Sequence, residues 1–232
     1  MDAEGGVVSL HIYPELEQRS DEWAAQRRGM VTASVVGQLI TTKTLAVASN
    51  DYSRALTMAL VAERISDYTE PTYLNFDMMR GIEDEPRAVA VYSERYAPVQ
   101  TCGFMVRDDW SFSIGYSPDG LVGDDGLIEV KSRRAKKQLQ TVLEDAVPVE
   151  NMAQIQCGLL VSGREWCDYV SFCGGWPLYV KRVEPDPEWH RAIVAAVAAF
   201  ELAADGMVAA FKQATKGLPM TERPANLDEL VI

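Results

Sequence analysis

The stretch from Ser117 to Lys131, SPDGLVGDDGLIEVK, constrains the fold most, because it predicts a strand end, a turn and a hairpin leading into another strand. If residues 127–132 form that strand, successive side chains point to opposite faces of the sheet. Glu129 and Lys131 then share one face, and the apolar residues beside them point to the other. The pattern therefore predicts an acid and an amine next to each other on one strand.

Asp119, in the turn before the hairpin, completes an acidic pair with Glu129 and has the ammonium of Lys131 beside it. Two carboxylates can hold a hard divalent cation such as Mg²⁺ through oxygen ligands. A lysine beside them can orient or deprotonate a water, or balance the charge of a phosphate. This combination is typical of a nuclease site.

The net charge of −12 argues against general nucleic-acid binding, because affinity for phosphates comes from Lys and Arg. Residues 131–137, KSRRAKK, nevertheless hold five of the 22 basic residues, directly after the proposed site. An acidic protein can bind DNA through one such patch. Taken alone, the run is better explained as a solvated basic turn.

The N-terminal part predicts two short helices that place polar groups together. The first begins after Ser20, which is a good N-cap, and ends at Gly29. The second is capped by Thr32, so that Ser34 lies in its first turn, where free N–H groups favour an anion. With Arg27 or Arg28 nearby, these groups can form a phosphate pocket. A helix-turn-helix with an exposed arginine pair fits the same local sequence equally well.

Residues 76–96 have apolar residues at helical spacing, and Glu85 falls on the same stripe. A carboxylate on a buried face is costly unless it is paired or bound to metal. Pro86 implies that the helix either begins near Glu85 or is kinked there. The alternative is that the break turns Glu85 to solvent.

The rest of the chain predicts an α/β protein. Three strands, 99–106, 110–116 and 127–132, are expected to form an antiparallel meander. Gln156 lies on the apolar side of a predicted helix, where its amide needs partners. The other expected elements are a loop at 41–50, helices at 51–65, 135–146 and 149–161, strands at 167–173 and 177–183, and a helix from Asp186.

Composition sets the broad class of the protein. The length of 232 residues and the 47% hydrophobic fraction predict a single globular domain, with a core at about 20–185, a C-terminal helix at 187–216 and a polar tail at 217–232. The cysteines lack metal-binding spacing, so buried reduced thiols are expected. We judge the apolar runs too short for a membrane helix and find no signal peptide at the N-terminus, so a cytoplasmic protein without membrane contact is expected.

The order of these elements, with Pro118-Asp119 followed by Glu129-Val130-Lys131, resembles the PD-(D/E)xK nuclease superfamily. A larger set of ordered blocks resembles the phage lambda exonuclease or YqaJ-like viral recombinase family within it. The blocks span roughly residues 20–165 and are Trp23-x-x-x-Arg27-x-Gly29, Thr32-Ala33-Ser34, Gly81-x-x-x-Glu85, Ser117-Pro118-Asp119-Gly120, Glu129-x-Lys131 and Met152-Ala153-Gln154-Ile155-Gln156.

This resemblance implies a restriction-endonuclease-like core, with a central mixed sheet flanked by helices. It implies a Mg²⁺-dependent 5′-to-3′ exonuclease on double-stranded DNA, which releases mononucleotides and leaves 3′ overhangs for a single-strand annealing partner. Two ions are expected, with Mn²⁺ able to substitute. The family also implies a homotrimeric ring on DNA ends and a phage or prophage gene in a bacterial cell.

Residue roles follow from the same resemblance. The implied metal ligands are Asp119, Glu129, the Val130 carbonyl and Glu85, with Lys131 activating or positioning the attacking water. The terminal 5′ phosphate is expected at Arg27, Ser34 and Ser117, helped by Gln156. Contacts to the DNA backbone are expected from Arg28, Arg133, Arg134, Lys136 and Lys137.

Two other readings stay open at this point. The chain can be an endonuclease or nickase of the same superfamily that lacks preference for an end. It can also be a DNA-binding assembly module with an inactive site. A linear and a nicked-circular substrate separate the first reading from an exonuclease.

Overall fold

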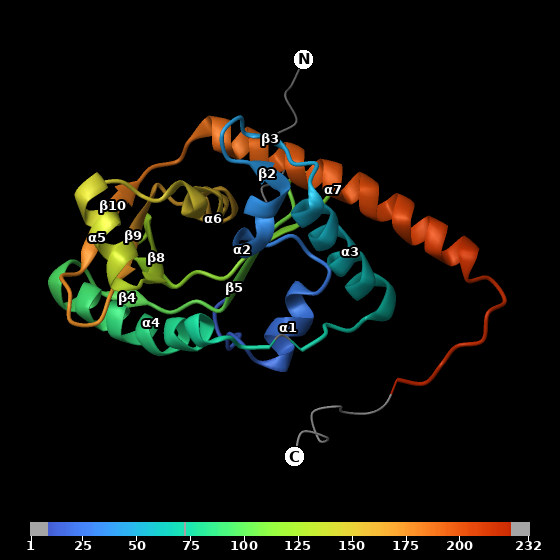
Figure 1. Ribbon diagram of the computed structural model, residues 1–232, viewed down its shortest axis with the longest axis horizontal. Helices are drawn as coiled ribbons and strands as arrows, with labels where there is room; N and C mark the ends of the chain where they lie inside the picture. Colours follow the sequence, from blue (N-terminus) through green and yellow to red (C-terminus); the bar gives the residue numbers. More distant parts are fainter. Residues whose placement is uncertain (1–8, 72, 224–232) are drawn as a thin grey trace.

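A computed structural model describes residues 9–71 and 73–223, and its central feature is a five-stranded mixed sheet (Figure 1). The strands are arranged in the order β10-β9-β8-β7-β4. Only β8 and β9 run parallel, in register from Gly126↔Trp166 to Ser132↔Phe172, and the other pairs are antiparallel. The five strands are β4 (Val99–Gln100), β7 (Gly120–Val122), β8 (Gly126–Ser132), β9 (Trp166–Phe172) and β10 (Tyr179–Val183).

A second, three-stranded sheet lies beside the first. It consists of β1 (Leu10–Tyr13), β5 (Phe104–Arg107) and β6 (Ile114–Tyr116), paired antiparallel in the order β1-β5-β6. The expected meander of three strands is therefore wrong, because its members are divided between two sheets. Trp110 and Phe112 stack on each other outside β6, with ring centroids 5.9 Å apart.

The expected strand 99–106 is broken between β4 and β5 by a close approach of two backbones. The N–H of Gly103 donates to the carbonyl of Pro14 at 3.2 Å, away from the sheet. A Cβ on Gly103 would lie 1.8 Å from the carbonyl oxygen of Leu16, so only glycine fits. The N-terminal segment that forms β1 thus sets the point where the chain leaves one sheet for the other.

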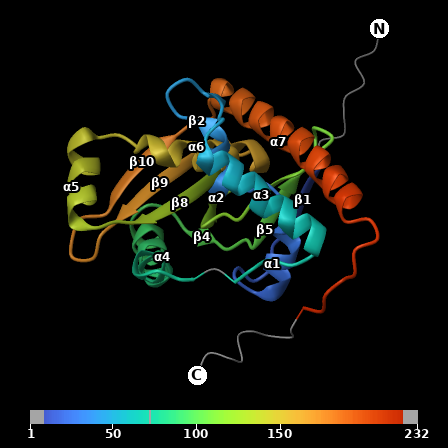
Figure 2. The same cartoon turned by 45° about the vertical axis from the view of Figure 1, so that its right-hand side comes forward.

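Helices cover both faces of the five-stranded sheet (Figure 2). On one face α4 (Phe76–Arg95) packs on β8, and Ala88 and Tyr92 join Ile128 and Val130 in a compact apolar cluster. On the other face α6 (Val149–Ser162) packs on β9 within the main core. This arrangement confirms the predicted α/β architecture with a central mixed sheet.

The remaining helices frame the site and the C-terminal side of the molecule. Residues 41–50 were expected to form a loop. The structure instead has a small hairpin there, in which β2 (Ile40–Thr41) pairs with β3 (Ala46–Val47). The other helices are α1 (Asp21–Arg27), α2 (Ala33–Val36), the 3-10 turn η1 (Gly37–Leu39), α3 (Asp51–Ser66), α5 (Ala135–Glu144) and α7 (Pro187–Ala214).

Helix α4 passes through Pro86 without interruption. The proline is exposed, and the hydrogen bond that its missing N–H removes lies at the outer side of the helix. The buried face consists of Asp84, Ala88 and Tyr92, whereas Met78 and Tyr96 of the expected stripe are exposed. Tyr92 is therefore buried as expected, but the buried acid is Asp84 and not Glu85.

Helix α7 is the only helix of residues 9–71 and 73–223 that is long and apolar enough to cross a membrane, which corrects the expectation that no apolar run has this length. Its first half instead packs into the protein core through Trp189, Ile193, Val197 and Phe200. Its second half extends past α3 and exposes Leu202. The end of the polar tail, residues 224–232, lies outside the described part of the chain.

Candidate active site

Strand β8 places its polar and apolar residues as its alternation predicts. Ile128 and Val130 lie in the cluster under α4, and Glu129 and Lys131 point to the opposite face. The pairing of β7 with β8 ends at Gly120↔Ile128, so Val130 has no strand partner on that side. The carboxylate of Asp119 takes this place and accepts the N–H of Val130 at 2.7 Å.

The side chains of Asp119, Glu129 and Lys131 meet at this point. Nζ of Lys131 lies 2.6 Å from Oε1 of Glu129 and donates to Oε1 of Gln154 at 3.0 Å. Glu129 is fully buried, and its Oε2 has no hydrogen-bond partner among the described residues. A buried carboxylate oxygen without a partner is costly, so this site has capacity for a cation.

The electrostatics of the site reflect this burial. Burial and the charge of Glu129 raise the pKa of Asp119 well above its ordinary value, against the opposing effect of Lys131. Burial lowers the pKa of Lys131, but the attraction of Glu129 and Asp119 outweighs it, so the net shift is upward. The amine therefore keeps its proton at neutral pH.

The oxygen donors fit a hard cation such as Mg²⁺. Asp119 and Glu129 supply two carboxylates next to each other, which is the ligand chemistry that Mg²⁺ prefers. Within the described residues no three His, Cys, Asp or Glu side chains are already grouped as a metal cage. Glu85, the third acid expected at this site, instead pairs through its Oε2 with Nη2 of Arg19 at 3.0 Å.

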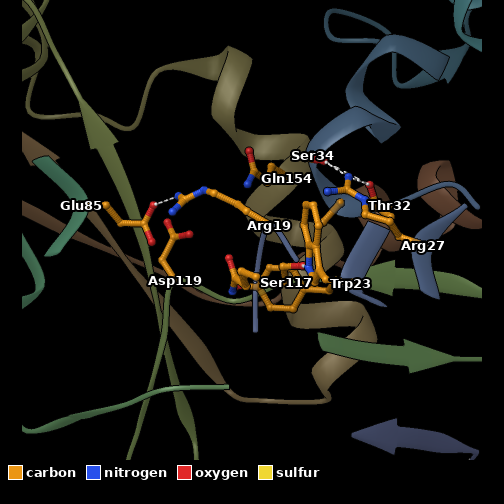
Figure 3. A pocket seen from close by; sticks show the side chains of 12 residues that line it. Arg19, Trp23, Arg27, Thr32, Ser34, Glu85, Ser117, Asp119 and Gln154 are labelled. Carbon is orange, nitrogen blue, oxygen red and sulfur yellow. Dashed lines mark hydrogen bonds and ion pairs between the residues drawn. The ribbon is translucent and has the colours of Figure 1, made fainter. Parts of the chain in front are cut away.

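Glu85 lies at the edge of the same pocket as Asp119 (Figure 3). Its side chain is 29% exposed, so it is neither buried on an apolar face nor turned away into solvent. Asp84 beside it is buried and accepts a 2.6 Å hydrogen bond from the hydroxyl of Ser132, the residue after Lys131. This contact fastens α4 to the end of β8, and the sequence patterns did not reveal it.

The expected phosphate-binding residues come together at the other end of the pocket. The guanidinium of Arg27 donates to the hydroxyls of Thr32 at 3.1 Å and Ser34 at 3.2 Å, and stacks over the ring of Trp23 at 4.1 Å. Nε1 of Trp23 donates to the hydroxyl of Ser117 at 2.8 Å. Burial lowers the pKa of Arg27, with Glu63 opposing the shift, but an arginine remains a cation at neutral pH.

Local sequence explains this geometry. Ser20 caps α1 by accepting the N–H of Trp23 at 3.1 Å, as predicted, and Gly29 ends the turn with φ +64°. Thr32 occupies the N-cap position of α2, but its hydroxyl bonds Arg27 and Ser34 and makes no cap. The hydroxyl is thereby available to the pocket.

Gln156 does not face the pocket, which corrects the expectation. Its amide is fully buried, where Nε2 donates to the carbonyl of Glu184 and Oε1 accepts the N–H of Asp186, both at 2.8 Å. Gln156 therefore stabilises the start of α7 through these two hydrogen bonds. Gln154, two residues earlier, lines the pocket and holds Lys131.

Helix α6 reaches this position because of a glycine. A Cβ on Gly158 would lie 2.7 Å from the ring of Tyr116, so the helix approaches β6 more closely than another residue would allow. Gln154 lies one helical turn before Gly158 and on the same side. The glycine thus sets the distance between Gln154 and the site.

The expected DNA-contacting residues are mostly engaged with protein groups. Arg133 donates to Asn151 and to the hydroxyl of Tyr169, with its Nη2–Oη distance 3.0 Å. The ion pairs are Arg28 with Asp67 at 2.7 Å, Arg134 with Asp77 at 2.8 Å and Lys137 with Glu150 at 2.9 Å, while Lys136 is exposed. All four cysteines are free and buried, as predicted.

Comparison with known proteins agrees with the fold. The profile of the YqaJ-like viral recombinase domain matches residues 22–165. An alkaline exonuclease from Laribacter hongkongensis is 30% identical, with a TM-score of 0.76 over 86% of this chain and 100% of that one. The same enzyme in complex with dAMP gives a TM-score of 0.74 at the same identity and coverage.

A phage-related exonuclease from Haemophilus somnus shares the fold, with a TM-score of 0.61 and 12% identity over 78% of this chain and 96% of that one. No match is found among curated proteins. The fold, a central mixed sheet flanked by helices, and the identity to the alkaline exonuclease define the class of this protein, a deoxyribonuclease. The chain belongs to the YqaJ-like viral recombinase family and is an exonuclease of that family.

Proposed function

We propose that this protein is a Mg²⁺-dependent exonuclease that digests double-stranded DNA from 5′ to 3′, releases mononucleotides and leaves 3′ overhangs. The observation that carries the proposal is the single pocket that joins Asp119 and Glu85 at one end to Arg27, Ser34 and Ser117 at the other. A strand whose terminal phosphate binds among the hydroxyls and the arginine can place a nearby phosphodiester at the carboxylates.

The cation site is proposed at Asp119, Glu129 and the Val130 carbonyl, with Glu85 serving a second ion. Mg²⁺ bound there would stabilise charge on the phosphate and lower the pKa of a bound water, and Mn²⁺ is expected to substitute. The proposed role of Lys131 is to activate or position the attacking water and to balance the phosphate charge. Gln154 and Glu129 hold Lys131 in position for this role.

Preference for an end follows from charge. A terminal phosphate carries more negative charge than a phosphodiester within a strand, and a guanidinium with two hydroxyls matches its oxygens. The pocket of Arg27, Ser34 and Ser117 is therefore proposed to select 5′-phosphorylated ends. The dAMP bound to the Laribacter enzyme supports mononucleotides as the product.

Assembly and context are proposed from the family. The chain is proposed to form a homotrimeric ring around DNA, to work with a single-strand annealing protein, and to be encoded by a phage or prophage in the bacterial cytoplasm. Arg28, Arg133, Arg134, Lys136 and Lys137 are proposed to contact the DNA backbone. Since most of these pair with acids in the free chain, binding would exchange those partners for phosphates.

The test compares linear duplexes with 5′-phosphate or 5′-hydroxyl ends and a closed circle, each with Mg²⁺. We expect fast digestion of the phosphorylated duplex, slow digestion of the hydroxyl duplex and no cleavage of a closed circle. In Arg27→Ala the two linear duplexes are expected to be digested at similar slow rates. Cleavage of closed circular DNA would establish the endonuclease alternative, and binding without any cleavage would establish an inactive module.

A further inference from the structure

Arg19 lines the pocket, and the side-chain hydrogen bond that it makes is to Glu85. Figure 3 shows its side chain extending across the pocket toward Glu85 and Asp119, with Gln154 nearby. Its guanidinium pairs with Glu85 at 3.0 Å. The residue therefore occupies the path between a bound strand end and the carboxylates.

The backbone places Arg19 there at a conformational cost. Its φ is +73°, a left-handed value that favours glycine and is uncommon for a residue with a side chain. The turn is fixed on both sides, because Nε2 of Gln18 donates to the carbonyl of Pro118 at 2.9 Å and Ser20 begins α1. An arginine held in this conformation beside Pro118-Asp119 is aimed at the site by the fold.

The ion pair of Arg19 with Glu85 is readily exchangeable. The two side chains are 49% and 29% exposed, and exposed ion pairs are worth little because water and salt compete with them. Lys131 neutralises Glu129, and Arg19 in the same way neutralises Glu85. Glu129 and Glu85 thus each pair with a basic side chain, and the more exposed pair, Arg19 with Glu85, is the weaker ion pair.

A bound metal ion and Arg19 would compete for the same carboxylate. Once Glu85 binds an ion, the guanidinium loses its partner and remains in the pocket. A planar guanidinium fits two phosphate oxygens at once, which makes a phosphodiester its natural second partner.

On the basis of the proposed function, we propose that Arg19 is an exchangeable clamp. In the free protein it neutralises Glu85. When the site holds metal and DNA, it releases Glu85 and binds a phosphate of the strand between the terminal-phosphate pocket and the carboxylates. Arg19 would then be a substrate-binding residue of the exonuclease and a competitor of the metal.

Arg19→Gly tests this proposal, because glycine is favoured at φ +73° and the fold is expected to survive. One readout is the Kd of Mn²⁺ for the free protein by calorimetry. The other is KM for a 5′-phosphorylated duplex at saturating Mg²⁺. We expect Mn²⁺ to bind roughly two- to fivefold more tightly, the size of an exposed ion pair, and KM to rise about tenfold or more, as for a lost charge-assisted hydrogen bond.

Arg95→Ala, at the exposed end of the same helix as Glu85, removes a charge without touching the pocket and should change neither value. A merely structural Arg19 would weaken metal and DNA binding together, and that result would overturn the proposal. Unchanged Mn²⁺ affinity, or unchanged KM in a variant that binds Mn²⁺ more tightly, would also overturn it. If the wild type digests no DNA with Mg²⁺, the proposed exonuclease function is wrong. Tighter Mn²⁺ binding by Arg19→Gly would then support only the competition between Arg19 and the metal ion for Glu85.

Discussion

Lys131 donates a hydrogen bond to Oε1 of Gln154 at 3.0 Å, which joins strand β8 to helix α6 at the wall of the pocket that Gln154 lines. The contact holds the ammonium between an amide and the buried carboxylate of Glu129. Gln154 therefore belongs to the site, and Gln156 belongs to the structure that supports α7.

Substitutions at the two glutamines should separate these roles. Gln154→Ala is expected to lower kcat about tenfold, the size of one lost hydrogen bond to a charged group, with little change in stability, because Lys131 loses the amide that holds it. Gln156→Ala is expected to cost about 1–3 kcal/mol of stability, because the Glu184 carbonyl and the Asp186 N–H lose their buried partner. Urea denaturation and steady-state digestion of each variant provide the comparison. Equal loss of stability in both variants would contradict the assignment.

The burial of Asp119 should lower the stability of the metal-free protein. A carboxyl whose pKa is raised by folding binds its proton more tightly when folded, so stability falls as pH rises from the unfolded pKa through the folded one. Asp119→Asn removes this cost and is expected to raise Tm at pH 8 but hardly at pH 4. A gain of about 1 kcal/mol corresponds to roughly 2–4 °C in a protein of this size.

Melting curves in EDTA at the two pH values measure this effect. Asp124→Asn, in the exposed turn before β8, is the matched control and should leave Tm unchanged at both. A lower Tm for Asp119→Asn at pH 8 would show that the hydrogen bond to Val130 outweighs the cost of burial.

The contact of Asp84 with Ser132 should fix the position of Glu85. Ser132→Ala removes a donor from a buried carboxylate, at an expected cost of about 1–3 kcal/mol. The affinity for Mn²⁺ should fall as well, because α4 carries Glu85. A double-mutant cycle of Ser132→Ala and Asp84→Asn measures the interaction free energy of the two side chains. Strictly additive losses of stability would contradict the proposed contact.

Helix α7 should behave as a core helix. Phe200→Ala is expected to destabilise the protein by about 3–5 kcal/mol, because the ring is buried against the core. Leu202→Ala, two residues further and 78% exposed, should change stability by less than about 0.5 kcal/mol. Equal small effects in denaturation would instead indicate that the helix is not docked as described.

The sequence predicted those parts of the site that depend on local periodicity. The alternation of β8 has a period of two and decided that Glu129 and Lys131 lie on the face opposite α4, and the cap at Ser20 fixed the start of α1. Gln154 could not be chosen over Gln156, because α6 is buried on most of its surface and its apolar pattern points to no single face. The break between β4 and β5 depends on Gly103 meeting Leu16, a contact between distant segments.

Glu85 shows the limit of a periodic pattern. The stripe on α4 predicted it as a buried acid, whereas the helix is rotated so that Asp84 is buried and Glu85 reaches the pocket edge. The rotation is set by the hydrogen bond of Asp84 with Ser132 and by Tyr92, whose hydroxyl donates to Asp168 at 2.7 Å. These partners lie far away in the sequence.

The most direct test is the digestion of end-labelled duplex DNA with Mg²⁺ by the wild type and by Lys131→Ala. We expect the wild type to release labelled mononucleotides from the 5′-phosphorylated strand. Lys131→Ala is expected to bind the duplex with similar affinity and to release none, with circular dichroism confirming its fold. Normal release of nucleotides by a folded Lys131→Ala protein would contradict the assignment of the active site.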